Sequence, residues 1–408
     1  MLRAGSICAS FLYTYLTSEI KEDEIENCDE NFKKKKLQMK CLSEVFANSG
    51  GVLSKIAQMM NIDSGEHDNQ VFSDCKPFNK EKTTQYLSEI VNTKFRDQII
   101  HFDTEVFKSG SIGQVHRAKT VLGEDIVMKV QYYGLLEQFD TDVKILNNVA
   151  YFLYYGKNSK NMLKDALVDI KDKLYEELDY ENEVKNHKKF YNIWKDDENI
   201  KVAKLYEHLC TDKIITMEFI EGEILSSYLE TASLEDKNFI CENIFDFIFI
   251  NLFHKKLFYI DIHYGNFLIN DKKQIYIMDF GCIENVEDEL LHNLKLLLKS
   301  LIDDDKDMFY ILMEEIGVLT NEIKEEKLIK HMYSKMKDLL EPMITETIFV
   351  FKDEWYEKVS SYDKESQSWV LPPNLVHFSK IPFGLFALFV KMKVEINLCE
   401  RIKKILKF

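Results

Sequence analysis

One lysine lies in the middle of a short apolar run, and its position constrains the fold strongly. Lys129 stands in the stretch IVMKV, whose composition predicts a β-strand. An ammonium group buried in such a strand is costly unless an anion lies beside it. The fold must therefore bring a carboxylate or a bound phosphate to Lys129, unless the strand lies at a sheet edge and the lysine points into water.

The patterns on either side of this strand change from helical to strand-like and back again. Short strands are predicted at 105–110, 113–120 and 125–131, after a helical N-terminal region. A long helical region, a strand in KIITMEFI, a strongly apolar helix, two short strand-bearing segments and further helices follow in that order. This order predicts an α+β, two-lobed protein-kinase-like fold with an N-terminal helical extension and a helical C-terminal lobe.

The chain is long enough for a large core and more than one lobe. We predict that residues 1–100 form the helical N-terminal extension, which carries the sequence KIAQ. Residues 101–220 are predicted to form the kinase-like N-lobe, and residues 221–408 the helical C-lobe.

Three polar residues in the predicted C-lobe have the types and spacing that phosphoryl transfer requires. Asp261 and Asn266 share a short loop, and Asp279 opens the tripeptide Asp-Phe-Gly downstream. In this chemistry one carboxylate orients the attacking hydroxyl or water, while an amide oxygen and a second carboxylate hold Mg²⁺ against the phosphates. Any one of these residues alone could form a turn. Together they predict Asp261 as the catalytic carboxylate and Asn266 and Asp279 as Mg²⁺ ligands.

The segment YEELDYENEV offers two acidic partners for Lys129, namely Glu177 and Glu183. On one helix these two side chains point in clearly different directions, so only one of them is expected to meet the lysine. Spacing alone does not choose between them.

A glycine-containing stretch, KSGSIGQ, precedes the lysine strand. Glycine permits positive φ and close backbone approach, which serve a tight hairpin turn and a phosphate loop equally. With Lys129 as a nucleotide ligand, we predict that this stretch covers the phosphates and that a later segment forms the adenine-binding hinge. The predicted ATP contacts are Ser109, Gly110, Ser111, Gly113, Lys129, Met217, Glu218, Phe219 and Ile220.

Composition narrows the expected partners and compartment. The net charge of -16 argues against a general nucleic-acid binder, which needs a basic face. The eight cysteines contain no Cys-x-x-Cys pair, which argues against a zinc ribbon and fits free thiols in a reducing compartment.

The apolar stretch IPFGLFALFV is too short for a transmembrane helix and predicts a buried one. The N-terminus makes a poor signal or transit peptide, so cytoplasm is the default expectation.

Six motifs in the right order resemble those of the UbiB/AarF family of atypical kinase-like proteins, the ADCK group in animals. SKIAQ resembles that family's Lys-x-Gly-Gln motif, with its lysine at Lys55 and its glutamine at Gln58. SGSIGQVHRA resembles the family's alanine-rich loop, and VMKVQYYG resembles its lysine strand. EELDYENEV resembles the Glu-x-Asp helix motif, DIHYGN the catalytic loop, and Asp-Phe-Gly the metal-binding tripeptide.

The resemblance implies binding of ATP and Mg²⁺, with hydrolysis of ATP or phosphoryl transfer to a small-molecule or lipid-linked substrate. It also implies a link to ubiquinone or another isoprenoid lipid, and a mitochondrial or plastid location in eukaryotes. In the family the extension lysine meets the Glu-x-Asp motif, which gives Glu177 to Lys55 and leaves Glu183 for Lys129. The predicted catalytic set is then Asp261, Lys129, Glu183, Glu177, Lys55 and Gln58.

Two other functions compete with this interpretation. No Ala-Pro-Glu follows Asp-Phe-Gly, which argues against an ordinary protein kinase because the usual activation segment is missing. The intact lysine, asparagine and aspartates argue against a nucleotide-binding pseudokinase scaffold. Peripheral membrane contact through the C-terminal apolar helices is a further expectation, and the sequence identifies no protein partner.

Overall fold

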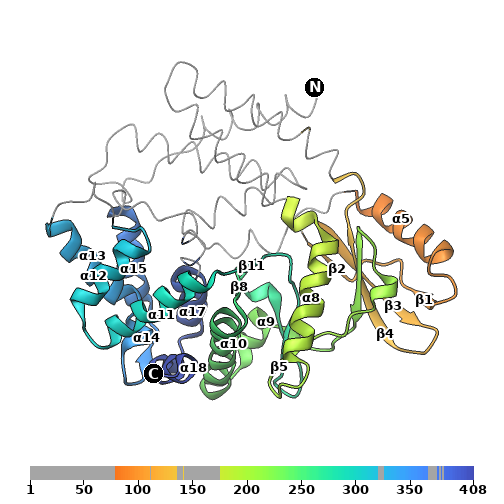
Figure 1. The fold of residues 1–408 in the computed structure, drawn as a ribbon. Helices are drawn as coiled ribbons and strands as arrows, with labels where there is room; N and C mark the ends of the chain where they lie inside the picture. The colour runs from red at the N-terminus through yellow and green to blue at the C-terminus, as the bar shows by residue number, and fades with distance from the viewer. Residues whose placement is uncertain are drawn as a thin grey trace, which may run out of the picture. The chain divides into compact units, whose positions relative to one another are not determined.

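The computed structural model describes residues 79–110, 112–135, 141, 175–319, 326–365, 375, 378 and 381–408 (Figure 1). These residues form two compact units. One unit comprises the described residues up to Val184 together with Lys204–Phe219, and the other comprises Lys185–Ala203 and Ile220–Phe408. Most of the predicted N-terminal extension, including Lys55 and Gln58, lies outside the described residues.

The first unit is built on a five-stranded antiparallel sheet with the order β1-β3-β4-β6, in which β2 also pairs with β3. The predicted strands at 113–120 and 125–131 are confirmed with those bounds. The predicted strand at 105–110 is reduced to Lys108–Ser109, because Glu105 N–H donates to the Asp103 carboxylate in a turn. The strands are β1 (Ile99–Phe102), β2 (Lys108–Ser109), β3 (Gly113–Thr120), β4 (Asp125–Gln131) and β6 (Ile214–Glu218).

The two faces of this sheet have different roles. Ile126, Met128 and Val130 alternate along β4 and are fully buried in a core shared with Leu87 of helix α5 (Lys80–Thr93). Alternation along a strand places Lys129 on the opposite face. There it pairs in register with Val115 of β3 and Ile215 of β6. The sheet therefore has an apolar face covered by α5 and a second face that carries the lysine.

The second unit is mainly helical, with small sheets. A four-stranded sheet has the order β5-β10-β9-β7, and two-stranded sheets join β8 to β11 and β12 to β13. Its strands are β5 (Ile200–Val202), β7 (Glu223–Ile224), β8 (Leu257–Tyr259), β9 (Phe267–Ile269), β10 (Ile275–Ile277), β11 (Ile283–Asn285), β12 (Phe349–Val350) and β13 (Glu395–Ile396). Its helices are α9 (Leu225–Thr231), α10 (Leu234–Lys255), α11 (Asp288–Ile302), α12 (Lys306–Glu315), α13 (Glu326–Leu339), α14 (Glu341–Ile344), α15 (Asp353–Glu365), α17 (Phe386–Met392) and α18 (Leu398–Leu406).

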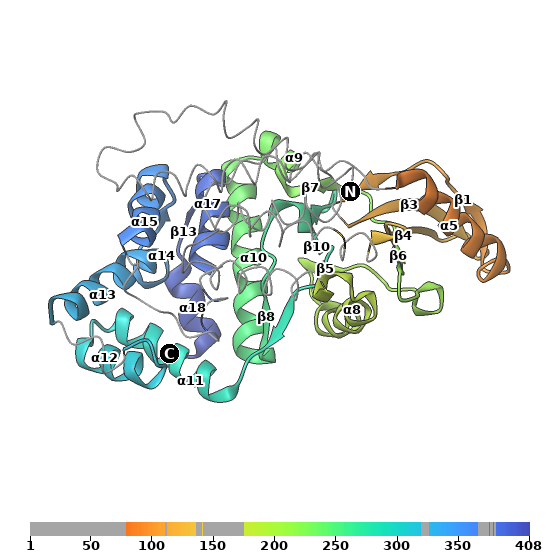
Figure 2. The same cartoon turned by 90° about the horizontal axis from the view of Figure 1, so that it is seen from above.

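Helix α10 is the centre of this unit. Ser233 caps its N-terminus by accepting a hydrogen bond from Asp236 N–H, and Lys256 ends it in the left-handed conformation. A helix this rich in apolar residues has to be buried along most of its surface, and the acidic Glu242 and Asp246 on it pair with Arg401. In the views of Figures 1 and 2, α10 lies between β8 and α18, both of which contact it.

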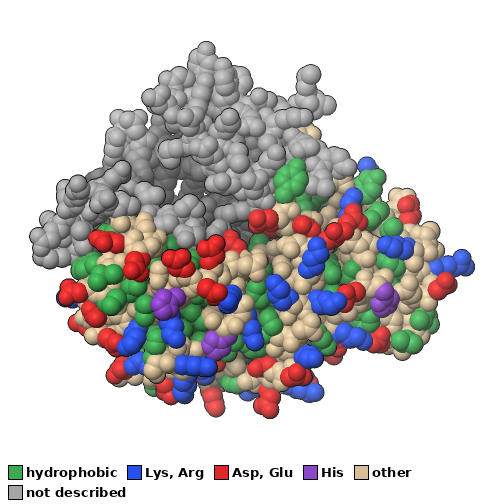
Figure 3. Space-filling view, viewed as in Figure 1, with side chains coloured by type: hydrophobic (Ala, Val, Ile, Leu, Met, Phe, Trp, Pro, Cys, Tyr) green, Lys and Arg blue, Asp and Glu red, His purple; other side chains and the backbone are tan. Residues whose placement is uncertain are grey.

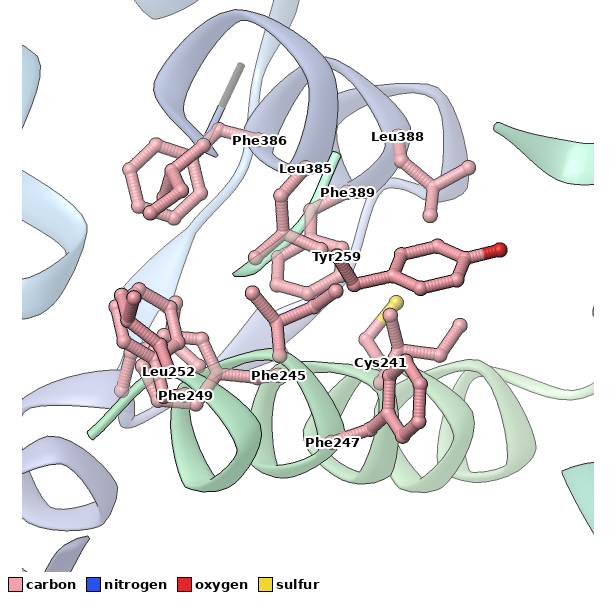
Figure 4. Packing of buried hydrophobic residues seen from close by; sticks show 14 of the residues in the cluster. Cys241, Phe245, Phe247, Phe249, Leu252, Tyr259, Leu385, Phe386, Leu388 and Phe389 are labelled. Carbon is pink, nitrogen blue, oxygen red and sulfur yellow. The ribbon is translucent and has the colours of Figure 1, made fainter. Parts of the chain in front are cut away.

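The C-terminal apolar stretch packs onto α10, as Figure 4 shows. Leu385, Phe386 and Phe389 face Phe245 and Phe249 of α10 in one buried cluster. The stretch forms a short π-helical turn, Ile381–Leu385, followed by α17. The prediction of a buried helix here is confirmed, and none of the described helices is long and apolar enough to cross a membrane.

The described surface carries charges of both signs. Figure 3 shows lysine and arginine side chains interspersed with acidic ones over the visible face. Several of these charges form exposed ion pairs, such as Lys119 with Asp125 at 3.0 Å and Lys256 with Asp288 at 2.7 Å. Pairs of this kind contribute little to stability.

We predict that Phe245→Ala destabilises the second unit by about 3–5 kcal/mol, because the fully buried ring leaves a cavity in the core around α10. Urea unfolding followed by circular dichroism measures this loss. Leu234→Ala is the matched control on the same helix, since Leu234 is 45% exposed and should change the unfolding free energy by less than about 0.5 kcal/mol. Equal effects of the two substitutions would contradict the assigned core.

His116 is a buried histidine on the α5 face of β3. Its Nδ1 lies 3.0 Å from the Asp103 carbonyl oxygen, and its Nε2 lies 2.9 Å from the Gln114 amide nitrogen. A neutral ring satisfies both contacts, with Nδ1–H donating to the carbonyl. Burial lowers the pKa of His116 below its ordinary value, more than the contact with Asp103 raises it.

We therefore predict that the first unit loses stability as the pH falls from about 7.5 to about 5.5. A lowered pKa means that the unfolded chain takes up the proton first, so the stabilisation is complete above the ordinary histidine pKa and is lost below it. His116→Asn should flatten this dependence in urea unfolding measured at each pH. An unchanged pH dependence in the variant would show that another group is responsible.

Candidate active site

The β9–β10 hairpin brings Asn266 and Asp279 to the same end of a small sheet. Phe267 of β9 is opposite Ile277 of β10, so the residue before β9 lies beside the residue after β10. The Met278 N–H accordingly donates to the Asn266 carbonyl oxygen at 2.9 Å. Buried apolar side chains of both strands anchor the hairpin in the core. The predicted pair of Mg²⁺ ligands is thus positioned by a strand register.

Asn266 also fixes Asp261. Its amide nitrogen donates to the Asp261 carbonyl oxygen at 3.0 Å and to the carboxylate Oδ2 at 2.9 Å. The Asn266 side chain is buried, whereas that of Asp261 is 35% exposed. Because the amide nitrogen of Asn266 faces Asp261, the amide oxygen on the other side of the group is directed elsewhere, as a metal ligand requires.

His263 is linked to the same carboxylate. Its Nδ1 accepts a hydrogen bond from Gly265 N–H at 3.0 Å, so a neutral ring carries its proton on Nε2. That Nε2 lies 3.3 Å from Asp261 Oδ2. A Cβ at position 265 would lie 2.9 Å from the ring, which explains the glycine. The contact of His263 with Asp261 could not be predicted from residue spacing.

The Asp-Phe-Gly tripeptide is anchored by contacts of all three of its residues. Asp279 Oδ1 accepts the Gly281 N–H at 2.9 Å. Phe280 is buried, with its ring centroid 5.0 Å from that of Phe190, and its carbonyl oxygen accepts from the Asn186 amide at 3.1 Å. The carboxylate of Asp279 therefore has a defined orientation.

In the first unit Lys129 forms an ion pair with Glu183. Lys129 Nζ lies 2.7 Å from Glu183 Oε1, and the two side chains are 18% and 3% exposed. Asp179 caps the start of helix α8 (Tyr180–Trp194) by accepting from Asn182 N–H at 2.9 Å, and the Gln131 amide donates to the Leu178 carbonyl oxygen. Of the two glutamates that the sequence left open, the structure therefore pairs Glu183 with the lysine.

The expected contact between Lys55 and Glu177 stays a prediction, because Lys55 lies outside the described residues. The same holds for Gln58 and for Ser111 of the glycine stretch.

The glycine stretch forms a hairpin in which the two glycines differ. Gly110 N–H donates to the Gly113 carbonyl oxygen at 2.8 Å, and the Tyr132 hydroxyl donates to the Gly110 carbonyl oxygen at 3.0 Å. A Cβ at Gly113 would lie 2.5 Å from the Val130 carbonyl oxygen, so close strand packing requires this glycine. A Cβ at Gly110 would meet nothing closer than 3.6 Å. Gly110, beside Ser109, is thus the glycine that strand packing does not explain.

The predicted hinge begins at the end of β6. Glu218 N–H donates to the Lys204 carbonyl oxygen at 2.9 Å, and Phe219 N–H donates to the Asp125 carbonyl oxygen at 3.0 Å. Met217 pairs with Val127 of β4, and Ile220 begins the next segment of the second unit. These two N–H groups are engaged in the structure, so an adenine would have to bond to other backbone groups here.

Sequence reasoning missed an aromatic–arginine stack beside this hinge. The Arg117 guanidinium carbon lies 3.8 Å from the centre of the Phe219 ring and 5.2 Å from that of Phe107. Register and alternation place Arg117 on the same sheet face as Lys129, across from Val127. The alternation along β3 was the signal in the sequence that could have found it.

The residues of the hairpin fit a magnesium ion only in part. The Asn266 amide oxygen and the Asp279 carboxylate are hard oxygen ligands of the kind Mg²⁺ prefers. Among the described residues, no group of three or more His, Cys, Asp or Glu side chains could hold a metal. Asn266 and Asp279 would hold such an ion, and oxygen ligands from outside the protein would have to supply the rest of its coordination.

We predict an interaction free energy of about 0.5–3 kcal/mol between Lys129 and Glu183 in a double-mutant cycle of Lys129→Met and Glu183→Leu. Each single substitution should be strongly destabilising, because it removes one partner of a mostly buried ion pair. Urea unfolding measures the four free energies.

The control cycle uses Lys119 and Asp125, an exposed ion pair of the same sheet with side chains 43% and 64% exposed. Its interaction should stay below about 1 kcal/mol. Equal values for the two cycles would contradict the burial assigned to the Lys129 pair.

The structure of Rv3197 from Mycobacterium tuberculosis, solved with erythromycin, matches with a TM-score of 0.67 at 20% sequence identity. The match covers 92% of this chain and 98% of that one. Together with the family match below, this likeness confirms the predicted α+β protein-kinase-like fold.

Two sequence relatives cover about two thirds of the chain. The atypical kinase COQ8, mitochondrial, of Saccharomyces cerevisiae is 30% identical over 292 residues, which are 68% of this chain and 57% of that protein. The probable serine/threonine-protein kinase abkA of Dictyostelium discoideum is 24% identical over 303 residues, which are 69% of this chain and 53% of that protein. The chain thus spans little more than half the length of these relatives.

A family model described as the ABC1 atypical kinase-like domain matches residues 70–312, more than half of the chain. That range includes Lys129, Glu183, Asp261, Asn266 and Asp279. The match confirms the resemblance to the UbiB/AarF group that the motifs indicated. The chain belongs to the ABC1 atypical kinase-like family.

Proposed function

We propose that this chain binds Mg-ATP and transfers or hydrolyses the γ-phosphate, acting on a small-molecule or lipid-linked substrate. The observation that carries the proposal is the arrangement of Asn266, Asp261 and Asp279. The Asn266 amide holds the Asp261 carboxylate, and the strand register brings Met278, the residue before Asp279, opposite Asn266. Phosphoryl transfer needs this combination of a base or orienting carboxylate with hard oxygen ligands.

In this proposal the residues of the second unit act on the acceptor and the metal. Asp261 orients the acceptor hydroxyl or water and accepts its proton. Asn266 and His263 hold the Asp261 carboxylate in place. Asn266 and Asp279 hold Mg²⁺, which when bound neutralises charge on the phosphates.

Residues of the first unit act on the nucleotide. Lys129 orients the α- and β-phosphates, and Glu183 holds its ammonium group at 2.7 Å. The backbone around Ser109–Gly113 covers the phosphates. The Arg117 stack adds a flat, positively charged platform on the lysine face, a kind of surface on which nucleobases stack.

The course of the chain after Asp-Phe-Gly supports a non-protein acceptor. The chain leaves Gly281, forms the short strand β11 paired with β8, and enters α11 at Asp288. A protein kinase uses a long segment here to bind its peptide substrate. The family resemblance extends the proposal to ubiquinone or another isoprenoid lipid.

The proposal also covers the binding partners of the chain and the cellular compartment in which it acts. We propose a small-molecule or lipid acceptor, peripheral contact with a membrane and no nucleic-acid partner. The name of the yeast relative includes the word mitochondrial, which makes the mitochondrion the first compartment to test.

We predict that purified protein releases phosphate from Mg-ATP and that Asp279→Asn lowers the rate by more than about 100-fold, since even outer partners of a metal ligand are worth 10- to 100-fold. Asp271→Asn is the matched control, an exposed aspartate in the β9–β10 turn that should leave the rate unchanged. Each protein is measured with and without anionic liposomes.

Two experimental outcomes would favour a different function for this chain. ATP binding without turnover would favour a nucleotide-binding pseudokinase scaffold. Robust phosphorylation of generic protein substrates would favour a protein kinase, the activity in the name of the Dictyostelium relative.

A further inference from the structure

Tyr259, the last residue of β8, carries a buried hydroxyl group without a hydrogen-bond partner among the described atoms. The whole side chain is only 1% exposed. Burying a polar group without a partner costs free energy, and the aromatic rings of Phe267 and Phe280 around Tyr259 offer its hydroxyl none. The hydroxyl group therefore calls for an explanation beyond packing.

The ring of Tyr259 lies among the residues that follow the two proposed metal ligands. Its centroid is 6.4 Å from that of Phe280, which follows Asp279, and 6.5 Å from that of Phe267, which follows Asn266. Figure 4 shows the hydroxyl end directed away from the apolar side chains of α10 and α17. The ring is thus packed in the core, and its oxygen is not aimed into the apolar cluster.

The surroundings of this oxygen are acidic. Burial raises the pKa of Tyr259 well above its ordinary value, and the carboxylates of Asp261 and Asp279 and the thiol of Cys282 raise it further, while the amide of Asn266, close to the hydroxyl, lowers it. The phenol is therefore neutral and remains a hydrogen-bond donor across the physiological range.

The nearby groups form hydrogen bonds of their own in this structure. The Asn266 amide nitrogen donates to the carbonyl and carboxylate oxygens of Asp261. One oxygen of Asp279 accepts the Gly281 N–H. A donor thus lies beside two carboxylates without bonding to either of them.

We propose that Tyr259 is a positioning residue whose hydroxyl donates to the Asp279 carboxylate when the metal–nucleotide complex is bound. The inference rests on the function proposed above. A carboxylate that ligates a metal is in turn held by hydrogen bonds, which fix its orientation and tune its affinity. The hydroxyl of Tyr259 is the buried donor that can serve this purpose without entering the metal's own ligand set.

Tyr259→Phe tests the inference because it removes one oxygen and keeps the ring. Two quantities are measured on the full chain: the melting temperature without ligand, and the Mg²⁺ concentration needed for half-maximal binding of a non-hydrolysable ATP analogue. The variant should melt at the same temperature or higher, since it loses an unsatisfied polar group. It should need about 10- to 100-fold more Mg²⁺.

Tyr228→Phe is the matched control, a half-buried tyrosine of α9 in the same unit that should change neither quantity. Equal Mg²⁺ dependence of wild type and Tyr259→Phe would overturn the inference while leaving the proposed function intact. A loss of melting temperature in the ligand-free variant, with unchanged Mg²⁺ dependence, would assign the hydroxyl a structural role. No Mg²⁺-dependent binding by the wild type would overturn the proposed function and this inference together.

Discussion

Burial of the β9–β10 hairpin in the core around α10 is the constraint on which the candidate site depends. Phe267, Ile269, Ile275 and Ile277 bury the two short strands, and their register leaves little freedom to the residues that flank them. Asn266 directly precedes β9, and Asp279 follows β10 after Met278. The hydrophobic effect thus fixes the position of polar groups that make no contribution to the core themselves.

The main polar groups of the site are also fixed by hydrogen bonds or ion pairs to neighbouring polar groups. Asn266 holds Asp261, Gly281 N–H holds Asp279, and Glu183 holds Lys129. Such preorganisation lets a site stabilise developing charge without rearranging at the moment of reaction. Tyr259 differs, because its donor has no partner yet, and this difference is what assigns it a role in the bound state.

The sequence predicted a feature correctly where the chemistry of a residue type permitted only one kind of environment. A lysine inside an apolar strand required a partner, and the alternation along β4 set its face. The apolar runs of α10 and of IPFGLFALFV had to be buried, as they are. Family membership followed from motif order and is confirmed by the match to residues 70–312.

The remaining features depend on tertiary contacts that spacing does not encode. The choice of Glu183 over Glu177 depends on how Gln131 and Asp179 orient the start of α8. The link from His263 to Asp261 depends on a three-residue turn closed by Gly265 N–H. The segment Met217–Ile220 stays the predicted adenine hinge, but spacing did not reveal that the N–H groups of Glu218 and Phe219 bond to the backbone of neighbouring segments.

The most direct test of the central claim is a crystal structure of the full chain with Mg²⁺ and a non-hydrolysable ATP analogue. The account predicts a metal about 2.0–2.1 Å from the Asn266 amide oxygen and from an Asp279 carboxylate oxygen, with phosphate oxygens completing its sphere. A nucleotide bound elsewhere, or a metal that contacts neither residue, would contradict it.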